Sequence, residues 1–147
     1  MTFNIDNREG KVTSKHIRME LLDANGKVKA TVERQIEVSG TSVDATLSTA
    51  LLKGLTPWNA ENPYLYDVVI SQYSEGKEEM VFSTKYGFRN IQLVNNDHNH
   101  YFTINGKRIF FKGTNVHDAH PLYGRYMDNE TMLKDLTLMK QANINTV

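Results

Sequence analysis

Apolar residues recur at every second position over most of the first 93 residues, and this alternation constrains the fold more than any other feature. The runs include Phe3 and Ile5, then Ile17, Met19 and Leu21, and later Tyr64, Tyr66, Val68 and Ile70. A period of two is typical of β-strands with one buried face, because successive side chains point to opposite sides. The pattern predicts six or seven short strands between Thr2 and Leu93.

The breaks between these runs carry turn residues. Asn25-Gly26 predicts a tight hairpin because both residues tolerate a positive φ, and Glu75-Gly76 is a weaker signal of the same kind. Consecutive strands are therefore expected to pair antiparallel, which favours an immunoglobulin-like β-sandwich over residues 1–94. Since the first run begins almost at Met1, we expect the amino-terminal strand of a seven-strand sandwich to be missing or short.

The pattern changes beyond Asn95. A polar stretch at residues 95–100 suits a surface connection, and Asn105-Gly106 indicates a second hairpin. Residues 108–115 contain a short apolar strand, residues 132–143 follow helical spacing behind a capping Asp128, and residues 144–147 begin another strand. Strand, helix and strand form a βαβ unit, which needs further parallel strands beside it. The predicted fold is mainly β, with this segment following the sandwich.

Four segments in order resemble glycoside hydrolase family 2, and specifically its β-galactosidases. They are residues 57–66 (PWNAENPYLY), 87–89 (GFR), 105–107 (NGK) and 112–121 (KGTNVHDAHP). The resemblance implies that residues 95–147 hold the first strand, first helix and start of the second strand of a TIM-barrel glycosidase domain. A complete (β/α)₈ barrel takes about 250 residues, so the barrel is expected to be truncated here.

The resemblance also implies an activity for a longer parent protein. That parent would hydrolyse terminal non-reducing β-D-galactose residues by a retaining mechanism with two glutamates on later barrel strands. No residue of this chain corresponds to either glutamate, so we expect no catalytic residue here and a scaffolding role for the segment. The acidic pair Glu78 and Glu79 is expected to be solvated surface.

His117 is the candidate substrate-binding residue of the parent, because it follows the first barrel strand and a family histidine here helps to hold the galactosyl group. Asn115 and Asp118 flank it, and we expect them to tie the loop and orient His117. Two departures from the family pattern, Val116 and Ala119, put any ion pair at those positions in doubt.

Other candidate sites are weaker. His117 with His120, and His98 with His100, lack a third ligand at useful spacing, so no metal site is predicted. Magnesium and sodium, which the resemblance implies for the parent, would have their ligands elsewhere. Three aromatic residues that could stack on sugars are expected instead to pack the sandwich core and its junction with the barrel: Trp58, Tyr64 and Tyr66.

Composition excludes several partners and classes. Seventeen basic side chains balance seventeen acidic ones, so no net field attracts nucleic acid or an anionic membrane. Cysteine is absent, which excludes disulfides and thiol nucleophiles. The start MTFNIDNREG lacks an apolar signal core and no run approaches a membrane span, so no membrane partner is expected and the compartment stays open.

The expected partners are those the resemblance implies: a β-galactoside in the parent, the remaining domains of its chain, and further copies in a homo-oligomer. One alternative is an independent immunoglobulin-like binding module whose βα arm docks a partner. Another is a segment of a β-glucuronidase or β-mannosidase, although residues 120–124 (HPLYG) after His117 look more like the galactosidases.

Overall fold

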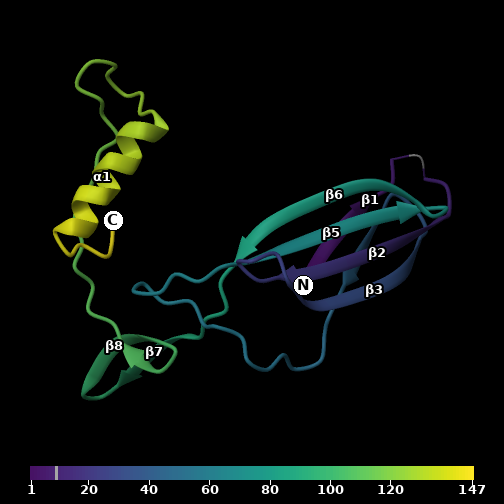
Figure 1. The fold of residues 1–147 in the computed structure, drawn as a ribbon, viewed down its shortest axis with the longest axis horizontal. Helices are drawn as coiled ribbons and strands as arrows, with labels where there is room; N and C mark the ends of the chain where they lie inside the picture. The colour runs from purple at the N-terminus through teal and green to yellow at the C-terminus, as the bar shows by residue number, and fades with distance from the viewer. Residues whose placement is uncertain (9) are drawn as a thin grey trace. The chain divides into compact units, whose positions relative to one another are not determined.

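The computed structural model describes residues 1–8 and 10–147. The chain divides into two compact units, Met1–Arg89 and Asn90–Val147, and Figure 1 labels most of their elements. Each unit has its own sheets, and each is described by itself below.

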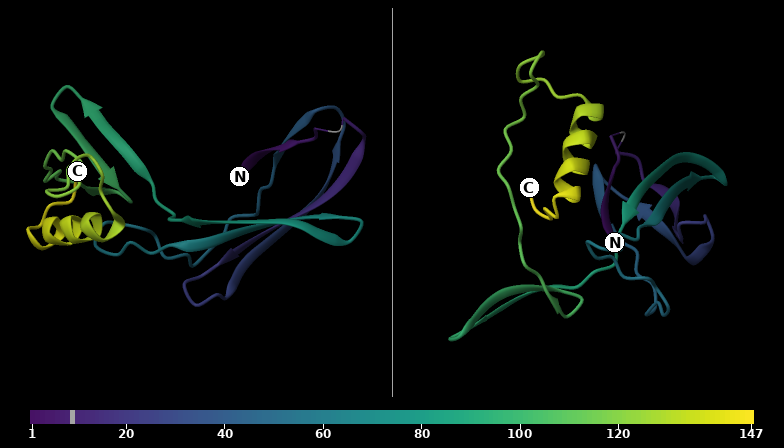
Figure 2. Two further views of the ribbon diagram at one scale, coloured as in Figure 1. Left: turned by 90° about the horizontal axis from the view of Figure 1, so that it is seen from above. Right: turned by 60° about the vertical axis from the view of Figure 1, so that its left-hand side comes forward.

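The first unit is an antiparallel β-sandwich. Its strands are β1 (Thr2–Asp6), β2 (Thr13–Leu22), β3 (Val28–Val38), β4 (Ser42–Thr46), β5 (Tyr66–Ser74) and β6 (Lys77–Tyr86). One sheet has four strands in the order β3-β2-β5-β6, and the other pairs β1 with β4. Figure 2 shows these twisted ribbons from two further sides. The mainly β, antiparallel prediction is confirmed.

β3 spans two apolar runs of the sequence. The apolar runs at residues 28–32 and 36–38 belong to one strand, because the inward positions continue in phase through Arg34, which pairs with the buried Ile17. The Arg34 guanidinium donates a hydrogen bond to the backbone oxygen of Thr46, 3.0 Å away. A polar residue on the inner face therefore interrupts the pattern without interrupting the strand.

The core lies between the two sheets, as the alternation predicts. One buried cluster comprises Ile5, Ile17, Ile36, Val38, Ala45 and Leu47, and a second comprises Leu21, Tyr66 and Val68. β4 contacts β3, so the two-stranded sheet covers that side of the larger sheet. An apolar groove of about 300 Å³ opens beside the core.

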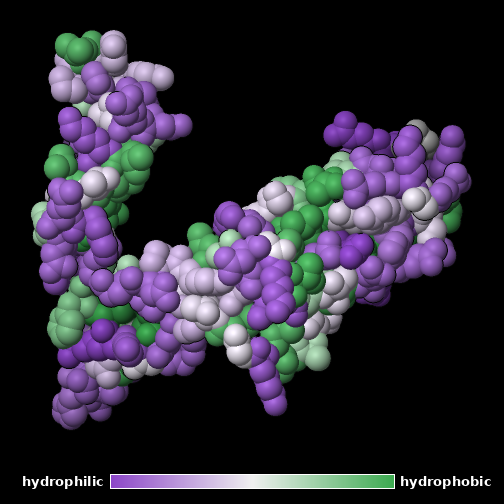
Figure 3. Space-filling model, viewed as in Figure 1, coloured by the Kyte–Doolittle hydropathy of each residue, from purple (hydrophilic) through white to green (hydrophobic). Residues whose placement is uncertain are grey.

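The β6 side of the larger sheet is less well covered. Phe82 pairs with Ile70 and Tyr86 pairs with Tyr66, so both face inward, yet they are 55% and 51% exposed. A two-stranded sheet is too narrow to bury four strands. Apolar surface is accordingly visible among hydrophilic residues over this unit in Figure 3.

The hairpin turns differ from the prediction in their backbone. At Asn25-Gly26 only the glycine has a positive φ, and Asp23 organises the turn because its carboxylate accepts from the backbone N–H groups of Asn25 and Lys27. Both residues have positive φ at Glu75-Gly76, where Ser74 pairs directly with Lys77. The two-residue loop expected at the first turn therefore occurs at the weaker signal.

The second unit contains a three-stranded antiparallel sheet and one helix. The strands are β7 (Ile91–Asn96), β8 (Asn99–Ile104) and β9 (Lys107–Arg108), in that order, and the helix is α1 (Asn129–Gln141). Residues 95–100 lie at the surface as expected, but they form the paired ends and the turn of the β7–β8 hairpin and not an unpaired connection. Asn96 closes its tip by accepting from the backbone N–H groups of His98 and Asn99.

The predicted barrel strands are present only as a short contact. Gly113 and Thr146 form an isolated parallel bridge, whereas extended strands were expected at residues 108–115 and 144–147. Arg108 belongs to β9, which pairs with β8. Among the described residues no further strand pairs with residues 110–115 or 144–147, so the parallel ladder has no neighbour to extend it. The parallel direction agrees with the start of a barrel.

The helix begins where the sequence predicts. The Asp128 carboxylate accepts from the backbone N–H of Thr131 at 2.7 Å, and Lys140 lies in the last turn. None of the described helical residues is buried. No helix in the described part of the chain is long and apolar enough to cross a membrane.

Acid is expected to release the Asp128 cap. The Thr131 N–H holds the pKa of this carboxyl below its ordinary value of 3.8, so the cap stabilises α1 above that value and the stabilisation is lost as pH falls through the lower, folded-state pKa. The amide resonance of Thr131 should report this step in an NMR titration below about pH 4. Asp128→Asn should lack the step and Asp97→Asn should keep it; an unchanged step in Asp128→Asn would contradict the assignment.

Candidate functional site

The candidate site is the loop that follows residues 110–114. Two backbone hydrogen bonds hold this segment to the end of the chain: Asn145 N–H donates to the Lys112 oxygen at 3.0 Å, and Thr114 N–H donates to the Thr146 oxygen at 3.2 Å. Both are arranged as in a parallel ladder. Barrel enzymes build their sites from the loops at the carboxyl ends of such strands, and residues 115–118 form such a loop here.

The structure places the three predicted site residues at the surface of this loop. Asn115, His117 and Asp118 are all exposed. No hydrogen bond or ion pair joins their side chains within residues 1–8 and 10–147, so the structure does not bring them together. The orienting role expected of Asn115 and Asp118 stays a prediction.

His120, for which no metal site was predicted from the sequence, organises the next turn. Its Nδ1 lies 3.0 Å from the Leu122 N–H and 3.3 Å from the Tyr123 N–H, and its ring stacks on Tyr123 with 4.4 Å between centroids. Because Nδ1 accepts from backbone groups, the proton of the neutral ring lies on Nε2. The signal in the sequence is Gly124, whose positive φ lets the chain turn back to pair with His120.

The other histidine pair lies in the β7–β8 hairpin. His100 Nδ1 contacts the side-chain oxygen Oδ1 of Asn95, and the backbone N–H of His98 donates to Oδ1 of Asn96. In the described part of the chain no group of three or more histidine, aspartate or glutamate side chains gathers as a metal site.

Two of the motifs from the sequence interlock in the first unit. Gly87 lies so close to Trp58 that an added Cβ would fall 2.9 Å from the Cβ, Cγ and Cδ1 atoms of the indole side chain. Trp58 N–H donates to the Phe88 oxygen at 2.9 Å, and the Arg89 guanidinium lies 4.9 Å from the centre of the Trp58 ring. The glycine, phenylalanine and arginine of the GFR segment thus each contact this tryptophan, which supports a packing role for it.

Tyr66 joins the same region to the core. It is 2% exposed, its ring contacts Tyr64 and Phe88 edge to face, and its hydroxyl accepts from the backbone N–H of Thr56 at 2.8 Å. A buried tyrosine hydroxyl with a backbone partner is a satisfied core group. The structure therefore places Tyr64 and Tyr66 in packing contacts within the sandwich.

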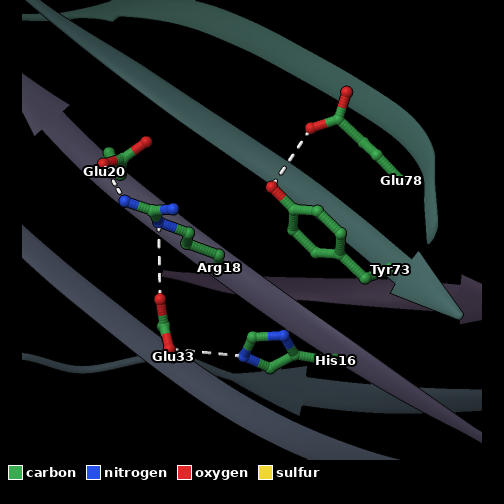
Figure 4. Close-up of polar contacts among 6 residues, drawn as sticks. All are labelled: His16, Arg18, Glu20, Glu33, Tyr73 and Glu78. Carbon is green, nitrogen blue, oxygen red and sulfur yellow. Dashed lines mark hydrogen bonds and ion pairs between the residues drawn. The ribbon is translucent and has the colours of Figure 1, made fainter. Parts of the chain in front are cut away.

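A polar cluster on the outer face of the four-stranded sheet was not singled out from the sequence (Figure 4). Arg18 is central: its guanidinium lies 2.7 Å from the Glu20 carboxylate and 3.4 Å from that of Glu33. His16 Nε2 lies 3.5 Å from Glu33, and its ring contacts Tyr73. The alternating polar positions of β2 are the signal that could have predicted this face.

This cluster lines a depression of about 410 Å³, and its charged groups pair with one another as ions, although Arg18 Nε forms no hydrogen bond within the described residues. Both carboxylates beside Arg18 are paired with the same guanidinium, which does not suit a general acid and a nucleophile acting separately. Partly exposed pairs of this kind contribute about 0.2–1 kcal/mol each. The geometry therefore indicates stabilisation of the sheet surface.

The acidic pair of β6 is engaged in similar surface contacts. Glu78 accepts from the Tyr73 hydroxyl at 3.1 Å, and Glu79 accepts from Lys15 at 2.7 Å and from Gln72 at 3.0 Å. The hydrogen bond from Lys15, more than that from Gln72, holds the pKa of Glu79 below its ordinary value. Glu79 is thus an ionised surface group at neutral pH.

The family models that match the chain cover both units. The model described as glycosyl hydrolases family 2 matches residues 1–89, and the model of the family 2 TIM-barrel domain matches residues 95–147. The two matches follow one another in the order that the sequence motifs indicate.

Curated relatives are β-galactosidases. The β-galactosidase of Halalkalibacterium halodurans is 40% identical over 129 residues, which cover 87% of this chain and 12% of that protein. The β-galactosidase of Streptococcus thermophilus is 37% identical over 140 residues, which cover 94% of this chain and 13% of that protein. The chain thus spans only about an eighth of the length of these relatives.

Solved structures share the fold. The β-glucuronidase of Bacteroides uniformis aligns with a TM-score of 0.82 at 20% identity, over 98% of this chain and 17% of that one. A family 2 member from Bacteroides cellulosilyticus aligns with a TM-score of 0.81 at 24% identity, over 98% of this chain and 19% of that one. The sandwich, the four motifs and both family matches together establish that the chain belongs to glycosyl hydrolase family 2.

Proposed function

We propose that this chain is a segment of a retaining β-galactosidase that removes terminal non-reducing β-D-galactose residues. The observation that carries the proposal is the identity of 37–40% to β-galactosidases over most of the chain. The strand-like segment ending in the loop of Asn115, His117 and Asp118 supports it, because a barrel enzyme places substrate-binding groups there.

In this proposal His117 binds the galactosyl group. An imidazole donates a hydrogen bond to a sugar hydroxyl, and that bond accelerates the reaction if it strengthens as the ring distorts toward the transition state. The exposure of His117 in this chain leaves it accessible to such a partner. Asn115 and Asp118 support the loop, and the two catalytic glutamates come from residues outside the chain.

The first unit serves as the scaffold. We propose that residues 1–94 form the immunoglobulin-like domain and that residues 95–147 open the catalytic barrel; the structure divides the chain slightly earlier, after Arg89, so that β7 lies wholly in the second unit. The remaining domains of the parent chain and further copies in a homo-oligomer are its partners, and magnesium and sodium bind residues elsewhere in the parent. The apolar face of β6, exposed at Phe82 and Tyr86, is consistent with a sandwich that packs against other parts of a larger protein.

The proposal predicts different activities for the chain and its parent. The 147-residue polypeptide should not hydrolyse a chromogenic β-galactoside above buffer, because it lacks the paired carboxyl groups that glycoside hydrolysis requires. The longer parent protein that contains this chain should hydrolyse the galactoside. In that protein, His117→Ala should lower kcat/KM by about 100-fold or more, as loss of a transition-state hydrogen bond does.

The control is Asn95→Ala in the same protein, since Asn95 lies in the β7–β8 hairpin and has no role in the proposal. Matched β-glucuronide and β-mannoside substrates distinguish the alternative activities. Faster hydrolysis of the glucuronide than of the galactoside would overturn the substrate assignment. Hydrolysis by the repurified 147-residue chain would overturn the scaffolding role.

A further inference from the structure

The side chain of Asn145 forms hydrogen bonds with the backbone at both ends of residues 110–112, which lead into the His117 loop. This pair of hydrogen bonds is called the bracket below. The Oδ1 of Asn145 accepts from the backbone N–H of Lys112 at 2.8 Å, and its Nδ2 donates to the backbone oxygen of Phe110 at 2.9 Å. The backbone N–H of Asn145 also donates to the Lys112 oxygen. One asparagine therefore bonds three backbone groups of a segment that lies far from it in the sequence.

The amide takes the place of a peptide group in a parallel ladder. A carboxamide offers the same donor and acceptor as a backbone unit, and the backbone bonds between these two segments start only at Lys112. The Asn145 side chain extends that ladder back to Phe110. This extension stabilises the pairing of the two segments, which otherwise form only a single parallel bridge, between Gly113 and Thr146.

Thr146 helps to set the orientation of this amide. Its hydroxyl donates to the Asn145 Oδ1 at 3.0 Å, so the oxygen accepts from both Thr146 and Lys112 while Nδ2 faces the Phe110 oxygen. The reversed amide would oppose donor to donor at Lys112 and acceptor to acceptor at Phe110. The orientation is therefore the one that satisfies every partner.

We infer that Asn145 is a positioning residue for His117. Lys112 lies five residues before His117, so the register of residues 110–114 against residues 144–146 decides where the loop leaves the strand. The inference rests on the proposed function, in which His117 binds the galactosyl group. Misplacing a site group by about 1 Å can cost about 100-fold in rate. Loss of the Asn145 hydrogen bonds is therefore expected to lower activity by displacing His117.

The bracket is tested first in the 147-residue chain, without any activity. Asn145→Leu removes both side-chain hydrogen bonds at nearly constant size, and amide hydrogen exchange at Lys112 should become about 5- to 10-fold faster. Asn145→Asp keeps the acceptor for Lys112 and should change this exchange less. Asn95→Leu, at an asparagine of the β7–β8 hairpin, is the matched control and should change nothing at Lys112. Unchanged exchange in Asn145→Leu overturns the bracket.

The positioning role is tested in the longer enzyme. Asn145→Leu should lower kcat/KM for a nitrophenyl β-galactoside by about 10- to 100-fold, and the same change in a His117→Ala background should add little, because residues that act through one another are not additive. Full additivity of the two losses overturns action through His117. If His117→Ala alone has no effect, the proposed role of His117 fails, whereas the Lys112 exchange still decides whether Asn145 forms the bracket.

Discussion

Gly87→Ala is expected to lower the free energy of unfolding by about 2–3 kcal/mol, toward the upper end of the range for overpacked sites. The new methyl group would lie 2.9 Å from the Cβ, Cγ and Cδ1 atoms of Trp58. These atoms are close to the Trp58 backbone, so a simple rotation of a flexible chain end cannot relieve the contact. The backbone of the GFR segment or the indole must move, which weakens the contacts of Phe88 and Arg89 with their neighbours.

Urea unfolding followed by tryptophan fluorescence measures this effect, and Trp58 is the single tryptophan of the chain. Gly113→Ala is the matched control: a Cβ there would have only ordinary contacts of 3.5 Å with Thr146, and Gly113 does not have a positive φ. The control should shift the unfolding midpoint little. If the Gly87→Ala protein is as stable as the control, Trp58 can move away from the new methyl group without lowering the free energy of unfolding, which contradicts the prediction.

Tyr66→Ala is expected to cost about 3–5 kcal/mol, as other large aromatic truncations in cores do. The side chain is 2% exposed and contacts Tyr64 and Phe88, so its removal leaves a cavity where the second core cluster meets the GFR segment. Since a domain of this kind is stable by only about 5–15 kcal/mol, the variant should lose a large share of its stability and unfold at a clearly lower temperature.

Tyr66→Phe separates the ring from its hydroxyl. It keeps the packing but leaves the Thr56 N–H without the acceptor that lies 2.8 Å away, which should cost about 1–3 kcal/mol. Tyr86→Phe is the control, because Tyr86 is 51% exposed. Circular dichroism during thermal unfolding gives the order: Tyr66→Ala least stable, then Tyr66→Phe, then the control. Equal stability of the three variants would contradict a core role for Tyr66.

Local features of the fold were predictable from the sequence. The alternation predicted the strands of the sandwich because the period of apolar residues depends on the strand geometry itself. Asp128 predicted the start of α1, and Asn105-Gly106 predicted a hairpin in which both residues have positive φ. Each signal involves residues within a few positions of one another, so no knowledge of distant contacts is needed.

The turn at Asn25-Gly26 shows where such local reasoning stops. The dipeptide tolerates positive φ at both residues, yet only Gly26 adopts it, because the Asp23 side chain supplies a competing set of hydrogen bonds to the turn. The register between β2 and β3 must also be compatible with the pairing of β2 with β5 on its other side. A turn is therefore decided by the sheet that it connects as well as by its own two residues.

The candidate site divides in the same way. The residues of the candidate site were identified by resemblance, because short motifs and their order can be read from the sequence alone. The alternation of apolar residues by itself determined that the chain is mainly β and antiparallel. The tertiary structure alone decided that Gly87 lies against Trp58, that Arg18 joins two carboxylates on the outer face, and that Asn145 brackets residues 110–112. The physical reason is that periodicity reports which face of an element is buried, whereas the partner on that face depends on how distant segments pack.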